Sequence, residues 1–484
     1  MHLPSKTLIE SLFKLGLEYP NHLAIISEGR KVLYGEFVQR IAATQMRLLD
    51  SDIKKGDRIL IMGSNHDSFA VAYFAVHSIG AVAVPVSSSL KKEELAFIIN
   101  DSKPKLGLTE NTQNLKINQQ ELETLTRTDS SKIMFKIFSN LKDNADILYT
   151  TGTTSKKGVL LTHLNIAAAA LNISTFIQNQ QSDLEILPIP LSHSFGLGRL
   201  RSMAVVGNSL VLEPGLRNPA LLLKRILDLK ADGLALVPAG FELILGLTRD
   251  KLADARDHLK YIEIGSAALR DETRRKLMAL LPKTRICHHY GLTEASRACF
   301  RELHADALKP ISIGRPSPNV QINIIDDHGI PLNVDQVGEI VINGAMTMKS
   351  YWNRPDLDSK SFCDYGLRTG DIGRIDKDGY IYLHGRQNDI INVGGLKVSP
   401  NEVEDVVIAN TVITDGACIG ISDSITGQKV KLFYVADDVL DDRYFINQLR
   451  DKLEEYKIPK LFQRISSIPK TESGKILREK LKEM

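Results

Sequence analysis

A run of hydroxyl-bearing residues, glycines and lysines between positions 150 and 159 is the part of the sequence best suited to chemistry. The apolar residues Ile147 and Leu148 predict a strand that enters the run, and the ten residues from Thr150 hold four Thr, one Ser, two Gly and two Lys. Glycine lets backbone N–H groups approach an anion closely, and hydroxyl and ammonium groups can complete a phosphate cradle. The run lacks the Gly-x4-Gly-Lys-Ser/Thr spacing of a Walker loop, because Val159 follows Gly158. Taken alone, it predicts either a phosphate-binding loop or a polar hairpin.

A second polar run follows the strand predicted at 284–287. It reads His288-His289-Tyr290-Gly291-Leu292-Thr293-Glu294. A carboxylate and a hydroxyl just past a strand end suit Mg²⁺, a hard cation that takes one or two carboxylates together with phosphate oxygens. Glu294 is therefore the candidate metal ligand.

Three more charged residues lie beside glycines at predicted turns. Asp371 follows Gly370, Arg386 follows Gly385, and Lys475 follows Gly474 near the carboxyl end. An aspartate at such a turn can accept hydrogen bonds from ribose hydroxyls. Each charge, taken alone, is more typical of a solvated turn than of a binding site.

The elements that must position these residues come from distant parts of the chain. Short apolar strands alternate with amphipathic helices from about 57 to 100 and from about 146 to 290, which predicts an α/β fold of parallel sheets with helices on both faces. Residues 111–145 are rich in Asn, Gln, Lys and Thr and predict a surface connection with one helix. Residues 314–385 carry short strands and turn signals, which predict a smaller β-rich subdomain. The remainder, from 386 to 484, predicts a compact α+β domain.

Length and composition exclude several classes of protein. The 484 residues exceed one ordinary domain, and the 43% apolar and 25% charged residues match a globular chain. A net charge of +3 gives no reason to expect nucleic acid or an anionic membrane as the main partner. The four cysteines form no disulfide framework. No run reaches the roughly 18 apolar residues of a membrane span, and the first residues lack a secretory leader pattern, so we expect a cytoplasmic protein.

Together and in this order, the motifs closely resemble the adenylate-forming superfamily of acyl-CoA synthetases, stand-alone adenylation domains and firefly-type luciferases. The resemblance runs from about residue 10 to the end of the chain. Its motifs are Tyr149-Thr150-x-Gly152-Thr153-Thr154, Tyr290-Gly291-x-Thr293-Glu294, Gly314-Arg315-Pro316, Tyr351-Trp352-x-x-Pro355, Thr369-Gly370-Asp371, Gly385-Arg386, Val398-x-Pro400-x-Glu402-x-Glu404 and Pro469-Lys470-Thr471-x-Ser473-Gly474-Lys475-x-x-Arg478.

The resemblance implies a two-step enzyme. A carboxylic acid attacks the α-phosphate of ATP, which gives an acyl-adenylate and pyrophosphate, and a thiol then displaces AMP. It divides the chain into an ATP- and acid-binding domain at 1–385 and a mobile lid at 386–484 that carries the catalytic Lys475. It assigns ATP binding to Thr150, Thr151, Gly152, Thr153, Thr154, Lys157, Gly265, Ser266, Ala267, Tyr290, Gly291, Asp371 and Arg386, with Thr293 at the α-phosphate and Glu294 on Mg²⁺. It also implies that Gly394 and Gly395 let a pantetheine arm pass and that Asn388 is the hinge.

The sequence departs from the family pattern at two of these places. The family usually reads Gly-Thr-Thr-Gly-x-Pro-Lys-Gly in the phosphate loop, whereas here Ser155 replaces a glycine and the proline is missing. The shortened loop is expected to be tighter, or to become ordered only with ATP. At the hinge the family more often has Asp or Lys than Asn388, although Asn also tolerates unusual backbone dihedrals.

The resemblance also bears on the substrate: adenylation domains for α-amino acids carry an aspartate in the region that corresponds to Leu187–Gly198, and none stands here. We therefore expect a carboxylic acid without an α-amino group. His193, Phe195 and Gly196 match the acyl-pocket element of the family, with a buried core histidine as the alternative for His193. The leading hypothesis is an acid:CoA ligase. The alternatives are an acyl-AMP ligase that loads the phosphopantetheine of a carrier protein and, from another class, an inactive nucleotide-binding homologue.

Overall fold

The computed structural model describes residues 3–110, 117–127, 135–150, 156–216, 218–387, 389–471, 474 and 476–484. The chain forms two compact units. The first comprises Met1–Gln321 and Ile342–Phe362, and the second comprises Ile322–Val341 and Cys363–Met484. The predicted boundary between residues 385 and 386 lies inside the second unit and stays a prediction.

A seven-stranded sheet in the first unit carries the predicted phosphate loop. Its order is β18-β8-β7-β4-β3-β5-β6, parallel from β7 to β6 and antiparallel at β8 and β18. The run Val82–Val86 is buried at every position, as expected of a strand with helices on both faces. The strands are β3 (Arg58–Met62), β4 (Val82–Val86), β5 (Leu106–Thr109), β6 (Gln119–Glu121), β7 (Asn144–Thr150), β8 (Lys157–Thr162) and β18 (Ser350–Tyr351). The helices between them in sequence are α3 (Asp67–Ser78), α4 (Lys92–Ser102) and α5 (Leu122–Leu125).

The segment 111–145 does more than connect these elements. Its described residues include the helix α5, as expected, but also the strand β6, which pairs in parallel with β5 and extends the sheet by one strand. Polar residues can form this strand because it lies at the edge of the sheet, where it pairs with one neighbouring strand only and is not enclosed on all sides.

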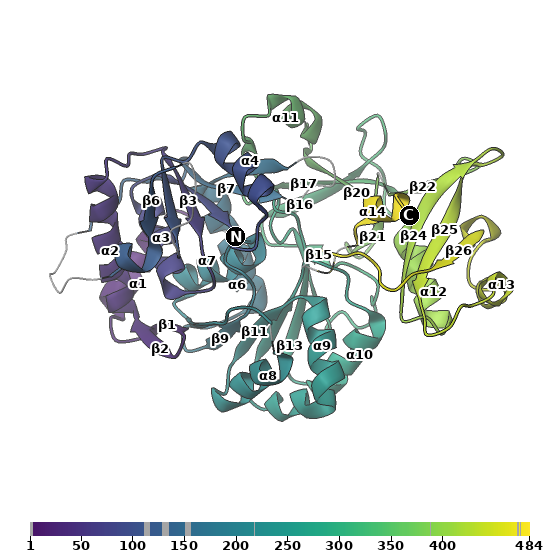
Figure 1. Ribbon diagram of the computed structural model, residues 1–484, viewed down its shortest axis with the longest axis horizontal. Coiled ribbons are helices and arrows are strands. Elements are labelled where there is room, and N and C mark those ends of the chain that lie inside the picture. Colours follow the sequence, from purple (N-terminus) through teal and green to yellow (C-terminus); the bar gives the residue numbers. More distant parts are fainter. Residues whose placement is uncertain are drawn as a thin grey trace. The chain divides into compact units, whose positions relative to one another are not determined.

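A nine-stranded sheet in the same unit carries the second polar run. Its order is β15-β14-β13-β12-β11-β9-β10-β1-β2, with parallel pairing from β13 to β1. In Figure 1, helices α8 (Pro219–Asp228), α9 (Pro238–Thr248) and α10 (Asp271–Leu280) are drawn in the same part of the picture as strands of this sheet. The strands are β1 (Leu23–Ser27), β2 (Arg30–Leu33), β9 (Leu184–Leu187), β10 (Ser209–Leu212), β11 (Gly233–Leu236), β12 (Tyr261–Ile264), β13 (Arg285–Tyr290), β14 (Cys299–Glu302) and β15 (Arg315–Pro316). The remaining helices of this unit are α1 (Leu8–Glu18), α2 (Tyr34–Asp50), α6 (His163–Ile177), α7 (Ser194–Val206), α8 (Pro219–Asp228), α9 (Pro238–Thr248), η1 (Arg249–Ala255), α10 (Asp271–Leu280) and α11 (Pro355–Ser361).

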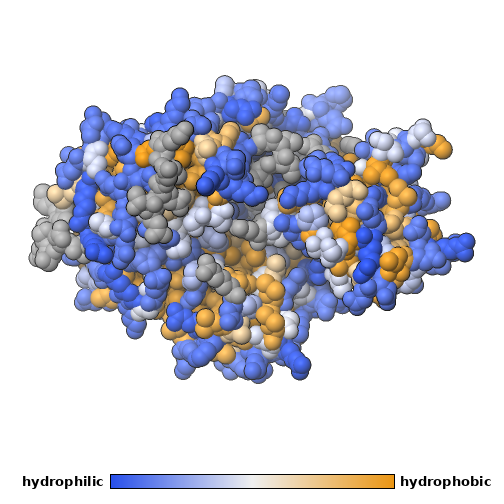
Figure 2. All heavy atoms as spheres, in the orientation of Figure 1, coloured by the Kyte–Doolittle hydropathy of each residue, from blue (hydrophilic) through white to orange (hydrophobic). Residues whose placement is uncertain are grey.

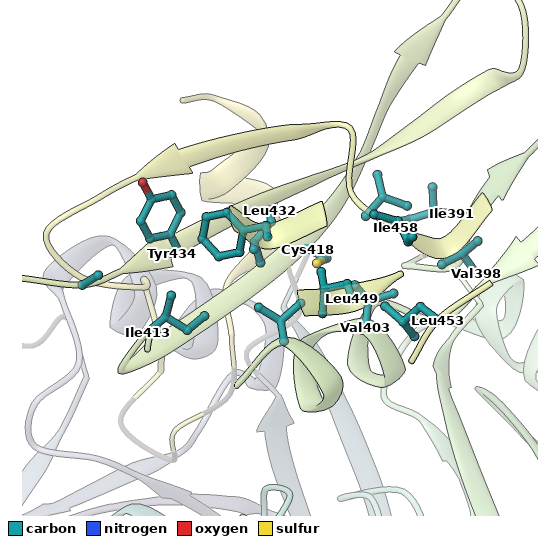
Figure 3. Packing of buried hydrophobic residues seen from close by; sticks show 14 residues of the cluster. Ile391, Val398, Val403, Ile413, Cys418, Leu432, Tyr434, Leu449, Leu453 and Ile458 are labelled. Carbon is teal, nitrogen blue, oxygen red and sulfur yellow. The ribbon is translucent and has the colours of Figure 1, made fainter. Parts of the chain in front are cut away.

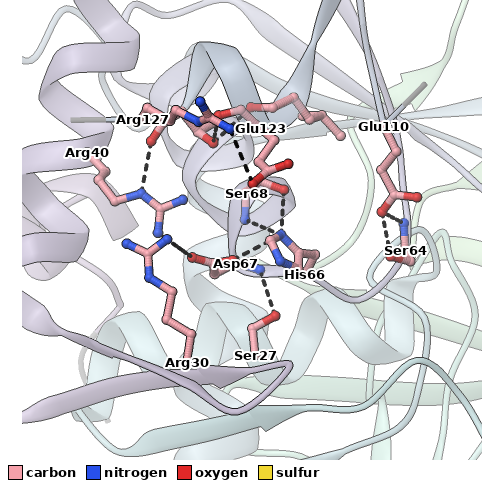
Figure 4. Close-up of polar contacts among 12 residues, drawn as sticks. Ser27, Arg30, Arg40, Ser64, His66, Asp67, Ser68, Glu110, Glu123 and Arg127 are labelled. Atoms are coloured by element: carbon pink, nitrogen blue, oxygen red, sulfur yellow. Dashed lines mark hydrogen bonds and ion pairs between the residues drawn. The ribbon is translucent and has the colours of Figure 1, made fainter. Parts of the chain in front are cut away.

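A buried polar cluster anchors the start of α3 at the end of β3 (Figure 4). Asp67 is the first residue of α3 and is completely buried, and it pairs with Arg40 and, at 3.0 Å, with His66. Burial raises the pKa of Asp67, but His66 and Arg40 outweigh it and hold the pKa well below its usual value. Arg40 also donates to the carbonyl of Thr126 at 2.9 Å. These contacts hold the loop between β3 and α3 in place. The helix dipole also stabilises an acidic residue at a helix N-terminus, as Asp67 is here.

The second unit contains most of one five-stranded sheet and a second five-stranded sheet covered by helices. The first has the order β16-β17-β20-β19, with β21 paired to β20; its strands are β16 (Val320–Ile325), β17 (Gly338–Gly344), β19 (Phe362–Cys363), β20 (Gly366–Ile375) and β21 (Ile381–Arg386). The second has the order β23-β22-β25-β24, with β26 paired to β25; its strands are β22 (Ile391–Val393), β23 (Leu396–Val398), β24 (Asp415–Asp423), β25 (Gly427–Val435) and β26 (Leu461–Arg464). The helices are α12 (Pro400–Asn410), α13 (Asp442–Leu449), η2 (Glu455–Lys457) and α14 (Arg478–Lys482).

The C-terminal sheet has a core of its own. Figure 3 shows Cys418 and Leu432 from the sheet facing Val403 of α12 and Leu449 of α13. These four side chains are completely buried. A separate apolar core is what a segment needs in order to keep its shape as an independent body.

The surface agrees with the balanced composition. Figure 2 shows a face on which apolar groups are interspersed among a majority of hydrophilic ones. Within the described residues, none of the helices has both the length and the apolar character needed to traverse a bilayer.

Candidate active site

The predicted phosphate loop joins two antiparallel strands. Thr150 at the end of β7 pairs with Lys157 at the start of β8. The Oγ of Thr150 is buried and has no hydrogen-bond partner among the described residues. Gly158 must be glycine, because a Cβ there would lie 2.8 Å from the side chain of Ile147. The predicted residues Thr151, Gly152, Thr153 and Thr154 lie outside the described residues.

Lys157 and Glu294, which are 137 positions apart in sequence, meet at a tyrosine. Lys157 Nζ lies 3.1 Å from Glu294 Oε1 and donates to the hydroxyl of Tyr351 at 2.5 Å. That hydroxyl in turn donates to Glu294 Oε1 at 2.8 Å. Lys157 Nζ also lies 4.1 Å from the centre of the Tyr351 ring. Burial and the Glu294 carboxylate raise the pKa of Tyr351, so it stays a hydroxyl donor. We call Lys157, Tyr351 and Glu294 the cation–carboxylate cluster.

The backbone explains how these three side chains come together. Tyr351 pairs with Val159 through the antiparallel strands β18 and β8, which brings it to the neighbourhood of Lys157. The carbonyl of Glu294 accepts from the backbone N–H of Met348 at 2.7 Å, which ties the segment after β13 to the segment before β18. The sequence motif Tyr351-Trp352-x-x-Pro355 marked this region but assigned Tyr351 no role.

The two histidines of β13 point to opposite faces of the sheet. His288 Nε2 lies 3.1 Å from the carbonyl of Ala267, whereas His289 Nδ1 lies 2.7 Å from Glu263 Oε1. Burial, together with the positive charge of Arg301, lowers the pKa of His288 to about 3. The ring of His289 packs onto Gly265, where a Cβ would lie 1.9 Å from the ring, so only glycine fits.

The residues predicted along the nucleotide flank these histidines. Tyr290 is the last residue of β13, and Gly291 lies so close to the backbone nitrogen of Arg297 that a Cβ would approach it to 2.5 Å. Ser266 has a φ of +75°, in the left-handed region. The tight turns that follow β12 and β13 therefore fix the loops in which Ser266, Ala267, Tyr290 and Gly291 lie.

The predicted acyl-pocket element is a tight turn into α7. His193 is the residue before the helix, and its backbone N–H donates to the carbonyl of Pro190 at 3.1 Å. Gly196 must be glycine because a Cβ there would lie 2.3 Å from that carbonyl oxygen. Asn65, in the rigid loop after β3, accepts from the backbone N–H of Leu191 at 2.8 Å. The turn is thus fixed from both ends.

A buried ion-pair network lies next to this turn, and sequence reasoning missed it. Arg297 Nε donates to Glu263 Oε1 at 3.0 Å, Arg199 Nη1 lies 3.4 Å from Glu263 Oε2, and Arg199 Nε donates to Glu185 at 2.7 Å. Burial alone would raise the pKa of Glu263, but the charge of Arg297 and the interaction with His289 outweigh it and hold the pKa well below its usual value. One feature of the sequence could have indicated this network: a glutamate in each of two otherwise apolar strands, Leu184–Leu187 and Tyr261–Ile264.

In the second unit, the structure brings Asp371 and Arg386 together. They are paired residues of β20 and β21, and Arg386 Nε lies 2.8 Å from Asp371 Oδ1. Asp371 is 3% exposed, and its backbone N–H donates to Thr369 Oγ1 at 3.0 Å. Gly370 has a φ of +68°, which explains a glycine at that turn.

The remaining predicted residues lie in the C-terminal part of this unit. Gly394 and Gly395 form the turn between β22 and β23 with φ values of +59° and +85°, which favour glycine. A Cβ at Gly395 would meet no atom within 4 Å, so the backbone conformation rather than crowding explains this glycine. Asn388 and Lys475 lie outside the described residues.

Comparison with known proteins finds matches along nearly the whole chain. A family model described as "AMP-binding enzyme" matches residues 15–352, and one described as "AMP-binding enzyme C-terminal domain" matches residues 402–475. A long-chain-fatty-acid–CoA ligase, FadD13 of Mycobacterium tuberculosis, is 30% identical over 89% of this chain and 88% of its own length. A 2-succinylbenzoate–CoA ligase of Bacillus velezensis is 27% identical over 96% of each chain.

Two solved structures share the fold. ATP-bound MatB from Rhodopseudomonas palustris superposes with a TM-score of 0.91 at 26% identity, covering 99% of this chain and 98% of that one. The o-succinylbenzoate CoA synthetase MenE from Bacillus subtilis, in complex with ATP and magnesium ion, gives a TM-score of 0.88 at 25% identity, covering 98% and 99%. The predicted fold class, stacked α/β layers with a β-rich part and a small α+β C-terminal part, is confirmed.

Proposed function

The chain belongs to the AMP-binding enzymes of the adenylate-forming superfamily, and from this premise we propose that it is an AMP-forming acid:CoA ligase. It activates a carboxylic acid with ATP, releases pyrophosphate, and transfers the acyl group to the thiol of CoA. Relatives that match over most of their length are named CoA ligases, which favours CoA over a carrier protein as the acceptor.

The observation that carries the proposal is the cation–carboxylate cluster. A lysine from the end of the phosphate loop and a carboxylate past the end of β13 share one tyrosine hydroxyl, at distances of 2.5 and 2.8 Å. The hydroxyl of Thr150, for which the described part of the chain provides no hydrogen-bond partner, lies at the other end of the same loop. A hydroxyl, an ammonium group and a carboxylate are the set needed to bind a polyphosphate with its Mg²⁺.

The residues present fit ATP and Mg²⁺. Glu294 would hold Mg²⁺, which supplies positive charge to the phosphates, and Thr150 to Thr154 and Lys157 would hold the β- and γ-phosphates. Asp371, fixed by Arg386, would accept from the ribose hydroxyls, while Tyr290 and the loop from Gly265 to Ala267 would flank the adenine.

In the first step, an oxygen of the acid forms a bond to the α-phosphorus, and the bond from that phosphorus to the oxygen of pyrophosphate breaks. Two anions react, so the chain's task is to neutralise charge and to align the reactants. We propose that Thr293 and Lys475 contact the α-phosphate, with Lys475 also holding the attacking carboxylate. In the second step the CoA sulfur attacks the acyl carbon and AMP leaves.

We further propose that residues 386–484 change orientation between the two steps about Asn388, and that Gly394 and Gly395 line the path of the pantetheine arm. The residues beside Asn388 are hydrogen-bonded on each side: Gln387 donates to the carbonyl of Gly370 at 2.8 Å, and Asp389 to that of Arg386 at 2.9 Å. The bond from Asp389, and a second one from the backbone N–H of Ile390 to the same carbonyl at 3.0 Å, cross position 388, so the proposed reorientation has to break both.

The acid is proposed to lie against His193, Phe195 and Gly196 and to have no α-amino group. No carboxylate side chain is available in the turn from Leu187 to Gly198 to pair an ammonium. A panel of carboxylic and α-amino acids, followed by pyrophosphate release, tests this assignment. Activation of α-amino acids in preference to their deaminated analogues would contradict it.

The acceptor is tested by measuring AMP formation with the best acid of the panel. Free CoA should support turnover, whereas a holo carrier protein should add nothing. Turnover near background with CoA but efficient loading of the carrier would replace the ligase with the carrier-loading enzyme. The absence of pyrophosphate release with every acid would favour an inactive nucleotide-binding homologue.

A further inference from the structure

We infer that Arg297 is a positioning residue for the acid: it fixes the first turn of α7, on which Phe195 lies, and so sets the shape of the acid pocket. This inference rests on the proposed function, because it takes the turn from His193 to Gly196 as the wall of that pocket. Arg297 itself need not touch the acid.

The guanidinium of Arg297 binds backbone carbonyls at the start of α7. Nη1 donates to the carbonyl of Ser194 and Nη2 to that of Phe195, both at 2.9 Å. The centre of the guanidinium also lies 5.0 Å from the centre of the Phe195 ring. On its other edge, Nε donates to Glu263 at 3.0 Å. The planar fork of one arginine therefore links strand β12 to the first two residues of the helix, which a lysine cannot do.

Helix α7 has a glycine at the place where the guanidinium of Arg297 approaches it. Gly198 lies one turn after Ser194, and a Cβ there would lie 2.3 Å from Nη1 of Arg297 and 2.6 Å from its Cζ. Glycine in a helix costs about 1 kcal/mol relative to alanine. The close approach of the guanidinium explains why that cost is tolerated at this position.

The backbone of Arg297 points to the same conclusion. Its φ is +54°, in the left-handed region that is unfavourable for a residue with a side chain. Its side chain is 2% exposed, so the charge is also removed from water. A strained backbone and a buried charge persist together only where the surrounding contacts determine them, and such positions cluster at functional sites.

The contacts of Arg297 lead directly to the predicted pocket residues. Phe195 is 4% exposed and meets the ring of His289 edge-on, with centroids 4.8 Å apart. His289 also contacts Glu263 and packs onto Gly265. A shift at the start of α7 would therefore move Phe195 and change the space beside Gly265.

The test uses two substitutions that disturb one contact from opposite sides. Arg297→Lys keeps a positive charge for Glu263 but loses the paired donors to Ser194 and Phe195. Gly198→Ala keeps Arg297 and pushes its guanidinium away, although the helix itself should gain stability. A displacement of about 1 Å can cost about 10²-fold, so we expect both variants to raise the KM for the acid by about 10- to 100-fold. The KM for ATP should stay near that of the wild type, and the order of preference across the acid panel should change.

Arg201→Lys is the matched control. Arg201 lies on the same helix and is 1% exposed, and it donates to the hydroxyl of Tyr73 at 2.9 Å and pairs with Asp146. Its loss disturbs an equally buried arginine away from the start of α7. We expect lower thermal stability in this variant with an unchanged KM for the acid.

Amide hydrogen exchange of the peptide that contains Phe195 gives a readout that needs no activity. Exchange should be faster in Arg297→Lys and Gly198→Ala than in the wild type, and unchanged in Arg201→Lys. If the two variants instead match Arg201→Lys in exchange and in KM for the acid, or raise the KM for ATP equally, Arg297 is only structural and the inference is wrong. Failure of the wild type to activate any acid would count against the proposed function, whereas the exchange result would still decide the role of Arg297.

Discussion

Replacing Tyr351 by phenylalanine removes a single oxygen from the cation–carboxylate cluster and leaves its aromatic ring in place. The hydroxyl donates to Glu294 at 2.8 Å and accepts from Lys157 at 2.5 Å. The ring face 4.1 Å from Lys157 Nζ stays, so the cation–π contact is preserved. The substitution therefore tests whether the hydroxyl holds the carboxylate and the ammonium group where Mg²⁺ and the phosphates need them.

The expected loss follows from these contacts. A hydrogen bond to a charged group contributes about 1.5–3 kcal/mol. Tyr351 is 5% exposed, so little water can replace the missing oxygen. Taking about 2 kcal/mol for the bond to Glu294, the affinity for ATP with Mg²⁺ should fall about 30-fold.

Isothermal titration with ATP and Mg²⁺ in the absence of acid measures this affinity directly, and pyrophosphate release at varied Mg²⁺ measures its effect on turnover. Tyr382→Phe is the control, because the Tyr382 hydroxyl also donates to a carboxylate, Asp376, at 2.9 Å but lies outside the cluster. It should bind ATP as the wild type does. A dissociation constant for Tyr351→Phe within about twofold of the wild type, in a protein with an unchanged melting temperature, would refute the role given to the hydroxyl.

Three other substitutions test separate parts of the reasoning. Asp371→Asn should raise the KM for ATP about tenfold and reduce the preference for ATP over its 2′-deoxy analogue; an unchanged ratio of the two kcat/KM values would contradict ribose binding at Asp371. Lys475→Ala should lower ATP–pyrophosphate exchange about 10²- to 10³-fold without a change in melting temperature, and exchange at the wild-type rate would remove Lys475 from the first step. His163 is completely buried, and burial, with the nearby His77, lowers its pKa to about 3 from 6.5. Between these values the unfolded chain binds a proton that the folded chain does not, so stability falls as pH falls, by about 2 kcal/mol at pH 5 for this group. In His163→Leu, the free energy of unfolding from urea titrations should differ less between pH 7 and pH 5 than in the wild type. An equal difference in the two proteins would show that His163 does not cause the loss of stability.

The class of fold could be predicted from the sequence because hydrophobic periodicity depends only on residues that are close together in the chain. The buried run at Val82–Val86 and the alternation from 146 to 290 report strands and helices covered on both faces, and the structure has them. The prediction failed in part at Gln119–Glu121, where an edge strand forms without an apolar pattern. Local hydrophobicity cannot report a strand that only completes an existing sheet edge.

The polar contacts of the site were less accessible to sequence reasoning. Motif order singled out Lys157 and Glu294, but only the pairing of β18 with β8 reveals that Tyr351 lies between them. Arg297 contacts carbonyls more than 100 positions earlier in the chain. Such contacts depend on which strands and helices become neighbours, and no periodic signal in one sequence encodes that choice.

The buried network around Glu263 also limits how the acid specificity of this chain can change, in evolution or by design. Removing one member of a buried ion pair leaves an uncompensated charge and costs about 3–5 kcal/mol, a large part of the stability of an ordinary domain. An apolar residue at position 297 alone would leave Glu263 with too little positive charge. A new acid preference that requires a different residue at 297 is therefore expected to need a second substitution at 263, and libraries that vary the two positions together should yield folded variants that single-position libraries miss.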